Sequence, residues 1–238
     1  VQVAVHHHHP IRQALGATEQ QCQAGEQAAA LDVRNITGAD GATNTLGVIT
    51  LPGFYWNPRA LSERDPEFRS STHDVRMLLK EARQKKVDGL ILDLRNNGGG
   101  LVDTGVDIAR LFLEEGEVMR QQFRGEEGEI FEVKSSGPFI DIPLVVFINE
   151  NTASAAEIVA GALAVHQRAS IIGAPSYGKN TVQYIFDLQD GSSLQITSGR
   201  WWTPGVDFPL QPDYPLAQDA IEPTYLRQAI EVLIGKLP

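Results

Sequence analysis

The stretch PLVVFINENTASAAEIVAGALAVHQRASIIGAPSYGKNTVQ, residues 143–183, decides the fold of this chain. Residues 144–149 form an apolar run with the length of a buried strand, and a helix of small residues is predicted to begin near Ser154. A second apolar strand at 169–173 leads into the turn Gly178-Lys179. Strand, helix and strand in this order indicate an α/β domain whose strands are covered on both faces.

A second strand–turn–helix unit precedes this stretch. Residues 89–94, GLILDL, form a continuous apolar run, and the glycine-rich turn RNNGGG follows at 95–100. A helix is predicted over 101–115, where apolar residues recur at helical spacing. The turn therefore lies at the carboxyl end of a buried strand, where α/β folds place their functional sites.

The chain divides into a main domain, residues 45–238, and a poorly readable segment, residues 1–44. In the main domain we expect a strand at 45–51, a charged surface loop at 63–68, a helix after the N-cap candidates at 70–72, hairpins at 118–133 and 184–198, an extended segment at 204–215 and a final helix at 224–234. Glycines punctuate the first 44 residues, which predicts irregular structure or short strands there.

Composition argues against several classes of protein. The chain has 238 residues and a formal net charge of −10, which argues against nucleic acid or an anionic membrane surface as the main partner. No stretch approaches the ~20 apolar residues of a membrane span, and the N-terminus lacks the apolar core of a signal peptide. The single cysteine, Cys22, excludes an internal disulfide. The run His6 to His9 lacks the spacing of a metal site, so we interpret it as a tag remnant or a solvated run.

Ser154 and Lys179 are the main candidates for chemistry. The start of a helix has unpaired N–H groups and a positive dipole end, which suit an oxyanion developing beside the Ser154 hydroxyl. A lysine acts as a base only if its pKa falls well below ~10.4, and burial among apolar groups lowers it. Gln183 lies four positions after Lys179, which in an extended strand is the same face, and its amide would orient the lysine without adding charge.

The three glycines at 98–100 are candidates for a second oxyanion donor, because glycine lets backbone N–H groups converge on a ligand. Each feature also has an ordinary interpretation. A serine at a helix start is a common N-cap, a lysine after a strand is usually a surface charge, and a run of glycines forms a tight turn. The combination favours a serine–lysine hydrolase.

Two other chemistries fit less well. Residues 173–181, GAPSYGKNT, nearly match the phosphate-binding loop, but Asn180 stands where the magnesium-binding hydroxyl belongs and the next residues predict a strand instead of a helix. In a serine–histidine–aspartate triad, His166 would lie about three helical turns, roughly 18 Å, from Ser154. His73 stays open as a base.

These motifs resemble those of the carboxyl-terminal processing proteases, also called tail-specific proteases. The resemblance covers about residues 45–213, with LPGFY at 51–55, DLRNNGGG at 93–100, NTASAAEI at 151–158, YGKNTVQ at 177–183 and a weaker PD pair at 212–213. It implies that Ser154 is the nucleophile, Lys179 the general base and Gln183 the residue that positions the lysine. It also implies that Gly100 and Ala155 belong to the oxyanion hole, to which we add Gly99 of the same turn.

The resemblance further implies a crotonase- or ClpP-like α/β core with mixed sheets and flanking helices, and no metal, nucleotide or other cofactor. It implies ATP-independent cleavage of proteins near flexible, apolar C-terminal tails, outside the cytoplasm. Members usually carry a PDZ domain before this core, and residues 1–44 are too short for one. We therefore expect either a trimmed or PDZ-lacking form or a different mode of tail recognition. Homo-oligomerisation stays open. The alternative is a non-catalytic module on the same fold that binds peptides or apolar ligands, using the glycine turn and Trp201-Trp202.

Overall fold

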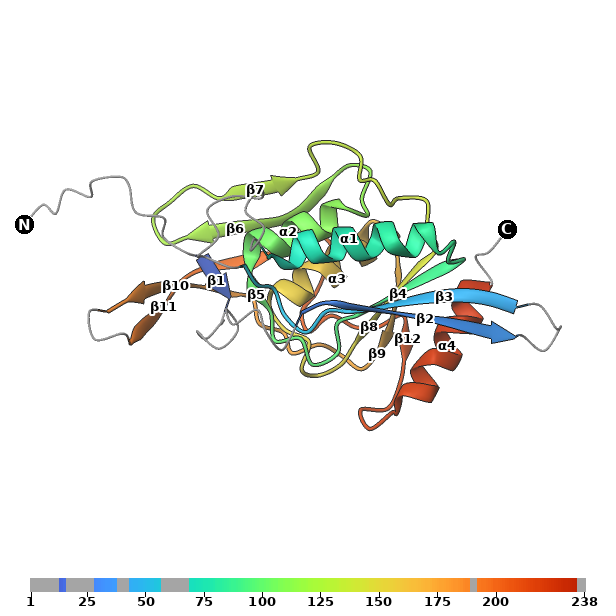
Figure 1. The fold of residues 1–238 in the computed structure, drawn as a ribbon. Coiled ribbons are helices and arrows are strands. Elements are labelled where there is room, and N and C mark those ends of the chain that lie inside the picture. Colours follow the sequence, from blue (N-terminus) through green and yellow to red (C-terminus); the bar gives the residue numbers. More distant parts are fainter. Residues whose placement is uncertain (1–12, 16–27, 38–42, 57–68, 189–191, 235–238) are drawn as a thin grey trace, which may run out of the picture.

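The computed structural model describes residues 13–15, 28–37, 43–56, 69–188 and 192–234. The strands in these ranges form two six-stranded sheets, which four helices accompany (Figure 1). The histidine run at residues 6–9, Cys22 and the loop predicted at 63–68 lie outside the described residues.

The parallel sheet contains both strand–turn–helix units and has the order β12-β9-β8-β4-β3-β2. Its strands are β2 (Ala30–Thr37), β3 (Thr43–Thr50), β4 (Gly89–Asp93), β8 (Leu144–Ile148), β9 (Ser170–Gly173) and β12 (Tyr214–Pro215). Only the edge strand β2 is antiparallel to its neighbour among these described strands. Because β4 and β8 are adjacent and parallel, with Asp93 opposite Phe147, the two turns that follow them begin side by side.

Helices cover both faces of the parallel sheet, as its continuous apolar strands predict. In β4, Leu90 and Leu92 join one core cluster and Ile91 joins the other, which is the alternation that a strand imposes. Helices α1 (Ser71–Gln84), α2 (Val102–Arg110) and α3 (Ala155–Val165) contribute to the first cluster. Helix α4 (Glu222–Ile234) packs against β8 and β9 from the other face (Figure 1).

Helix α3 is the central element of the core. Every residue from 155 to 163 is buried, and the helix contacts α2, β9 of the parallel sheet and β6 of the antiparallel sheet. A helix that is apolar all round must be enclosed, and its alanines and glycine allow neighbours to approach closely. The start of α3 is therefore fixed from several sides.

The antiparallel sheet has the order β5-β1-β10-β11-β6-β7. Its strands are β1 (Gln13–Leu15), β5 (Gly100–Leu101), β6 (Glu117–Phe123), β7 (Glu129–Glu132), β10 (Thr181–Asp187) and β11 (Ser193–Trp202). The hairpin of β10 and β11 extends away from the helices at the left of Figure 1. Strand β5 begins at Gly100, the last residue of the glycine turn, and β10 begins two residues after Lys179. The starts of both strands therefore lie next to predicted site residues.

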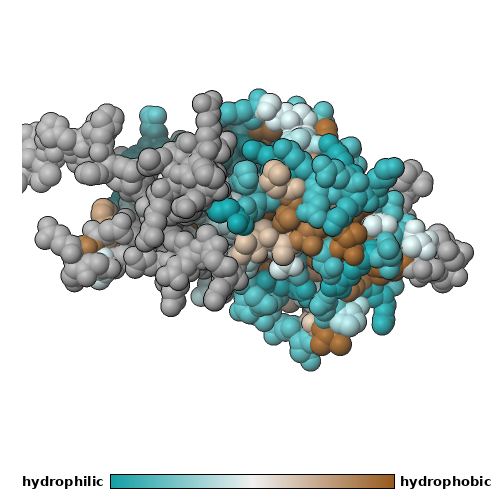
Figure 2. Space-filling view, in the orientation of Figure 1, coloured by the Kyte–Doolittle hydropathy of each residue, from teal (hydrophilic) through white to brown (hydrophobic). Residues whose placement is uncertain are grey.

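The described residues on the face in Figure 2 are mainly hydrophilic, with small hydrophobic patches among them. Within the described ranges, no helix combines the length and the apolar character that crossing a membrane requires.

Most predicted elements are present, and one predicted boundary is wrong. The predicted strands at 45–51, 89–94, 144–149 and 169–173, both hairpins and the final helix are confirmed to within a few residues, and β1 and β2 confirm short strands before residue 45. The helix predicted over 101–115 ends at Arg110 instead. The chain turns at Leu111 and Phe112, which, like Leu113, are almost fully buried. Three consecutive apolar side chains cannot share one helical face, so leaving the helix allows all of them to be buried.

Candidate functional site

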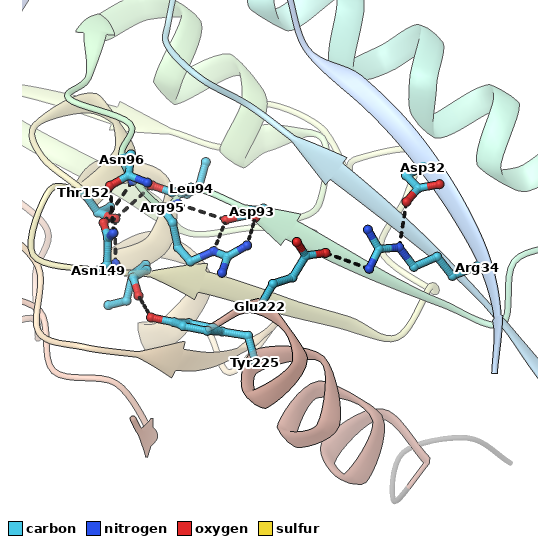
Figure 3. Close-up of polar contacts among 11 residues, drawn as sticks. Asp32, Arg34, Asp93, Leu94, Arg95, Asn96, Asn149, Thr152, Glu222 and Tyr225 are labelled. Atoms are coloured by element: carbon cyan, nitrogen blue, oxygen red, sulfur yellow. Dashed lines mark hydrogen bonds and ion pairs between the residues drawn. The ribbon is translucent and has the colours of Figure 1, made fainter. Parts of the chain in front are cut away.

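Side-chain hydrogen bonds join the turn after β4 to the turn after β8 at the carboxyl edge of the parallel sheet (Figure 3). Asn96 donates its backbone N–H to Asn149 Oδ1 at 2.9 Å, and Asn149 Nδ2 donates to Asn96 Oδ1 at 2.9 Å. Thr152 Oγ1 donates to the Leu94 carbonyl at 2.8 Å. Asn96 has φ 59, a left-handed conformation that asparagine tolerates better than most residues. The turn after β4 and the turn after β8 therefore behave as one polar unit.

Asn97 lies beneath this unit and is fully buried. Its Nδ2 donates to the Leu51 carbonyl at 2.8 Å, its Oδ1 accepts the Gly99 N–H at 2.9 Å, and its backbone carbonyl accepts the Ala153 N–H at 2.9 Å. One residue thus connects the LPGFY segment, the glycine turn and the residue before Ser154. The Gly99 N–H is engaged by this contact, which leaves Gly100 as the better donor candidate of the two.

Gly99 brings the glycine turn against Ser154. A Cβ placed on Gly99 would lie 2.7 Å from Ser154 Cβ and 3.0 Å from Ser154 Oγ, and Gly99 has φ 101. A Cβ on Gly100, at φ 141, would lie 2.1 Å from the Phe54 carbonyl oxygen. Only residues without a side chain fit these positions, because both the space and the backbone conformation exclude one. The structure therefore places together two parts of the predicted site, the glycines and the serine.

Ser154 occupies the N-cap of α3 in an unusual conformation, with φ 64 and ψ −120. A residue other than glycine in such a region costs on the order of 1–3 kcal/mol and persists only where its surroundings impose it. Ala155 follows as the first helical residue, so its N–H has no acceptor within the helix. The positive end of the helix and this N–H adjoin the serine, as the sequence predicts. The Ser154 residue exposes none of its surface.

The carboxylate of Glu157 joins the serine turn to the lysine loop. It accepts hydrogen bonds from Ser154 N at 2.7 Å, Ser176 Oγ at 2.5 Å, Gly178 N at 2.6 Å and Lys179 N at 3.0 Å. Glu157 is fully buried, and this burial raises its pKa while the four donors oppose the rise. The Ser154 and Lys179 N–H groups share one oxygen, Oε2, so the two nitrogens are no further apart than those two distances combined.

Lys179 and Gln183 also meet, as predicted. Lys179 Nζ lies 3.4 Å from Gln183 Oε1, and Gln183 Nε2 lies 3.5 Å from Thr197 Oγ1 on β11. Burial lowers the pKa of the half-buried Lys179 ammonium, while the charge of Glu157 acts in the opposite direction. A bulge between Val182 and Gln183 shifts the register of β10 against β11 at this point. The burial of Lys179 therefore acts in the direction that a lysine base would need, and Glu157 acts against it.

The other candidates lie differently. Residues 181–187 form β10, so the segment with the phosphate-loop pattern leads into a strand and not a helix. His166 is the C-cap of α3, at the end of the helix opposite to Ser154, and its Nε2 lies 2.8 Å from the Glu117 carbonyl oxygen. His73 lies in the first turn of α1, where its backbone N–H donates to Ser70 Oγ at 3.1 Å. Within the ranges that the structure covers, no three His, Cys, Asp or Glu side chains gather as a metal site would need.

Sequence reasoning missed Glu157, Asn97 and Ser176. A local signal existed for Glu157, because a serine followed three positions later by a glutamate at a helix start is the capping-box pattern. That pattern predicts only the contact with Ser154 N. The contacts with residues 176–179, and those of Asn97 with distant carbonyls, join segments that no sequence spacing relates.

Comparisons with known proteins agree with this geometry. The model of peptidase family S41 matches residues 45–223. The chain is 42% identical over 131 residues to a carboxyl-terminal-processing protease of Synechocystis sp., covering 55% of this chain and 30% of that protein. It is 36% identical over 168 residues to the chloroplastic C-terminal processing peptidase of Tetradesmus obliquus, covering 69% and 36%. The chain thus spans about a third of the length of these curated relatives.

Solved structures show the same fold. A photosystem II D1 C-terminal processing protease superposes with a TM-score of 0.65 at 31% sequence identity, covering 86% of this chain and 52% of that one. Mature CPAF superposes with a TM-score of 0.65 at 14% identity, covering 84% and 53%, which concerns the fold alone. The expected α/β core with mixed sheets and flanking helices is therefore confirmed.

We expect Glu157→Ala to lower the free energy of unfolding by at least about 3 kcal/mol, because it leaves several buried donors without an acceptor. Urea unfolding followed by circular dichroism measures this. Glu127→Ala, at an exposed turn, is the matched control and should change stability by less than about 0.5 kcal/mol. Equal stability of the two variants would show that the carboxylate does not hold the site together.

Gly99→Ala should lower the free energy of unfolding by about 1–3 kcal/mol, because the new methyl group meets Ser154 at a backbone conformation that is unfavourable for alanine. Gly98→Ala is its control in the same turn, since a Cβ there meets no atom within 4 Å and Gly98 has no positive φ. The same urea measurement compares them. Losses of similar size would contradict the close approach of the glycine turn to Ser154.

Proposed function

The chain belongs to peptidase family S41, and we propose that it is the core of a serine endopeptidase in which Ser154 is the nucleophile and Lys179 the general base. One observation carries the proposal. A single buried oxygen of Glu157 accepts from the backbone of both residues, which are 25 positions apart in the sequence and belong to different elements. The hydrogen bonds of this buried carboxylate draw the serine turn and the lysine loop together.

In the proposed reaction, Ser154 Oγ attacks the carbonyl carbon of a peptide bond while Lys179 Nζ accepts the hydroxyl proton. The N–H groups of Gly100 and Ala155 stabilise the oxyanion of the tetrahedral intermediate. Lys179 then returns the proton to the leaving amine as the carbon–nitrogen bond breaks, and an acyl-enzyme remains. A water molecule, deprotonated by the lysine, hydrolyses the acyl-enzyme and restores the free serine.

The other residues of the site position the groups that react. Gln183 orients the lysine amine through the contact at 3.4 Å and adds no negative charge that would raise the lysine pKa. Gly99, whose N–H donates to Asn97, lets the glycine turn reach Ser154 and keeps the neighbouring Gly100 in place. Ser154 lies in the connection between β8 and α3 with a strained backbone, and a strained strand-to-helix turn also holds the nucleophile of other serine hydrolases.

We further propose that residues 45–238 form the protease core, that cleavage needs no ATP, and that the substrates are proteins with flexible, apolar C-terminal tails. The names of the relatives, which are C-terminal processing enzymes, support this substrate class. The name of one relative places it in the chloroplast, and we propose an extracytoplasmic location here.

The first test is cleavage of an unfolded protein with an apolar C-terminus by the chain and by its Ser154→Ala, Lys179→Ala and His73→Ala variants. We expect Ser154→Ala and Lys179→Ala to lose at least about a thousandfold in rate, as loss of a nucleophile or its base does, and His73→Ala to retain the parent rate. Cleavage that survives Lys179→Ala but not His73→Ala would replace the lysine by the histidine as base. A folded chain that neither cleaves nor reacts with a serine-directed phosphonate would favour a peptide-binding module.

The pH dependence of kcat/KM tests the lysine separately. Lysine must be neutral to accept a proton, so activity should rise with pH through the pKa of Lys179. Because burial lowers this pKa, we expect the midpoint below the ordinary value of 10.5. Gln183→Glu puts a carboxylate beside the ammonium, which favours its charged form and should move the midpoint up by about one unit or more. A midpoint that is the same in the parent and in Gln183→Glu would show that another group titrates.

A further inference from the structure

A three-residue strand from the start of the chain lies inside the proposed site. Strand β1, Gln13–Leu15, stands between β5 and β10 in the antiparallel sheet and is antiparallel to both. Ala14 is opposite Leu101 of β5 on one side and Gln183 of β10 on the other, and Leu15 is opposite Gly100. The backbone of β1 therefore passes between the proposed oxyanion donor and the residue that positions the lysine.

The space that β1 fills is one strand wide. Neighbouring strands lie about 4.8 Å apart, so β5 and β10 face each other across two such spacings. An extended segment between them pairs with a strand edge on each side, whereas an empty gap would leave both edges with unpaired N–H and C=O groups. A two-sided gap of this kind takes an extended peptide by strand addition, and its main-chain hydrogen bonds do not depend on the side chains of the peptide.

The residues of the proposed site are buried, as expected if strand β1 of the same chain fills the gap between β5 and β10. Ser154 exposes none of its surface, and Gly99 and Gly100 are also buried. A substrate therefore cannot reach the serine hydroxyl of this arrangement unless a part of the chain moves. Strand β1 is three residues long and its ladder with β5 spans two of them, so its displacement breaks only a short stretch of pairing.

We propose that the gap between β5 and β10 is the substrate slot, and that residues 13–15 of the chain occupy it as an internal competitor of the substrate. This inference rests on the proposed function. The substrate strand takes the same direction as β1, antiparallel to both neighbours. The residue that replaces Leu15 then lies beside Gly100, so the scissile carbonyl belongs to that residue or its immediate neighbour. Cleavage requires that the tail of the substrate displace β1.

The test measures binding without catalysis, in a Ser154→Ala background. A fluorescent peptide with the sequence of residues 11–17, IRQALGA, is titrated against this chain with and without Ala14→Pro, and anisotropy gives Kd. Proline removes the N–H and does not fit between two strands, so it should expel β1 from the slot. If β1 fills the slot about nine-tenths of the time, its removal should lower the Kd of the peptide by at least about tenfold. Ala14→Ser keeps the N–H and should leave Kd unchanged.

Leu15→Pro is the second variant and should act like Ala14→Pro, with circular dichroism verifying that both are folded. Equal Kd values for the parent and the folded proline variants would overturn the internal competitor. When Ser154 is retained, the two proline substitutions should lower KM for an unfolded substrate and leave kcat unchanged. Tighter peptide binding without any cleavage would keep the slot and reject the serine–lysine mechanism, so the two proposals fail separately.

Discussion

The buried carboxylate of Glu157 is the constraint on which the site depends. Moving a carboxylate into the interior is unfavourable unless it is fully hydrogen-bonded, and Glu157 meets this requirement with three backbone N–H groups and one hydroxyl. These donors come from the start of α3 and from the loop before β10. The need to satisfy one charge therefore draws two distant segments together, and their approach sets where the serine and the lysine lie.

The parallel sheet supplies the support for this contact. Adjacent parallel strands end at one edge, so the turns after β4 and β8 can exchange side-chain hydrogen bonds through Asn96 and Asn149. Asn97 adds a buried anchor beneath them. This rigid frame holds Ser154 in a backbone conformation that an isolated chain would avoid. In the proposed mechanism, this imposed conformation pre-organises the serine for reaction.

The site lies where the two sheets meet. The serine and the start of the glycine turn follow strands of the parallel sheet, while Gly100 and Gln183 belong to the antiparallel sheet and Lys179 to the loop before β10. The strand β1 and the burial of Ser154 give this junction a further property, because the same sheet edges that would hold a substrate hold a piece of the chain. If this gap is the substrate slot, as we propose, selectivity for unfolded tails is expected, since only an extended backbone fits between two strands.

The sequence by itself determined the two strand–turn–helix units, the position of Ser154 at a helix start and the pairing of Lys179 with Gln183, because these follow from local periodicity and from short spacings. It also indicated where glycine was needed, but not that the N–H of Gly99 would be taken by Asn97. It placed the end of α2 too late, since the burial of Leu111 and Phe112 depends on neighbours from elsewhere in the chain. Only the tertiary structure decided the partners of Glu157 and the position of β1. Three residues such as Gln13–Leu15 contain no pattern, and what orders them is the pair of open strand edges that the rest of the fold provides.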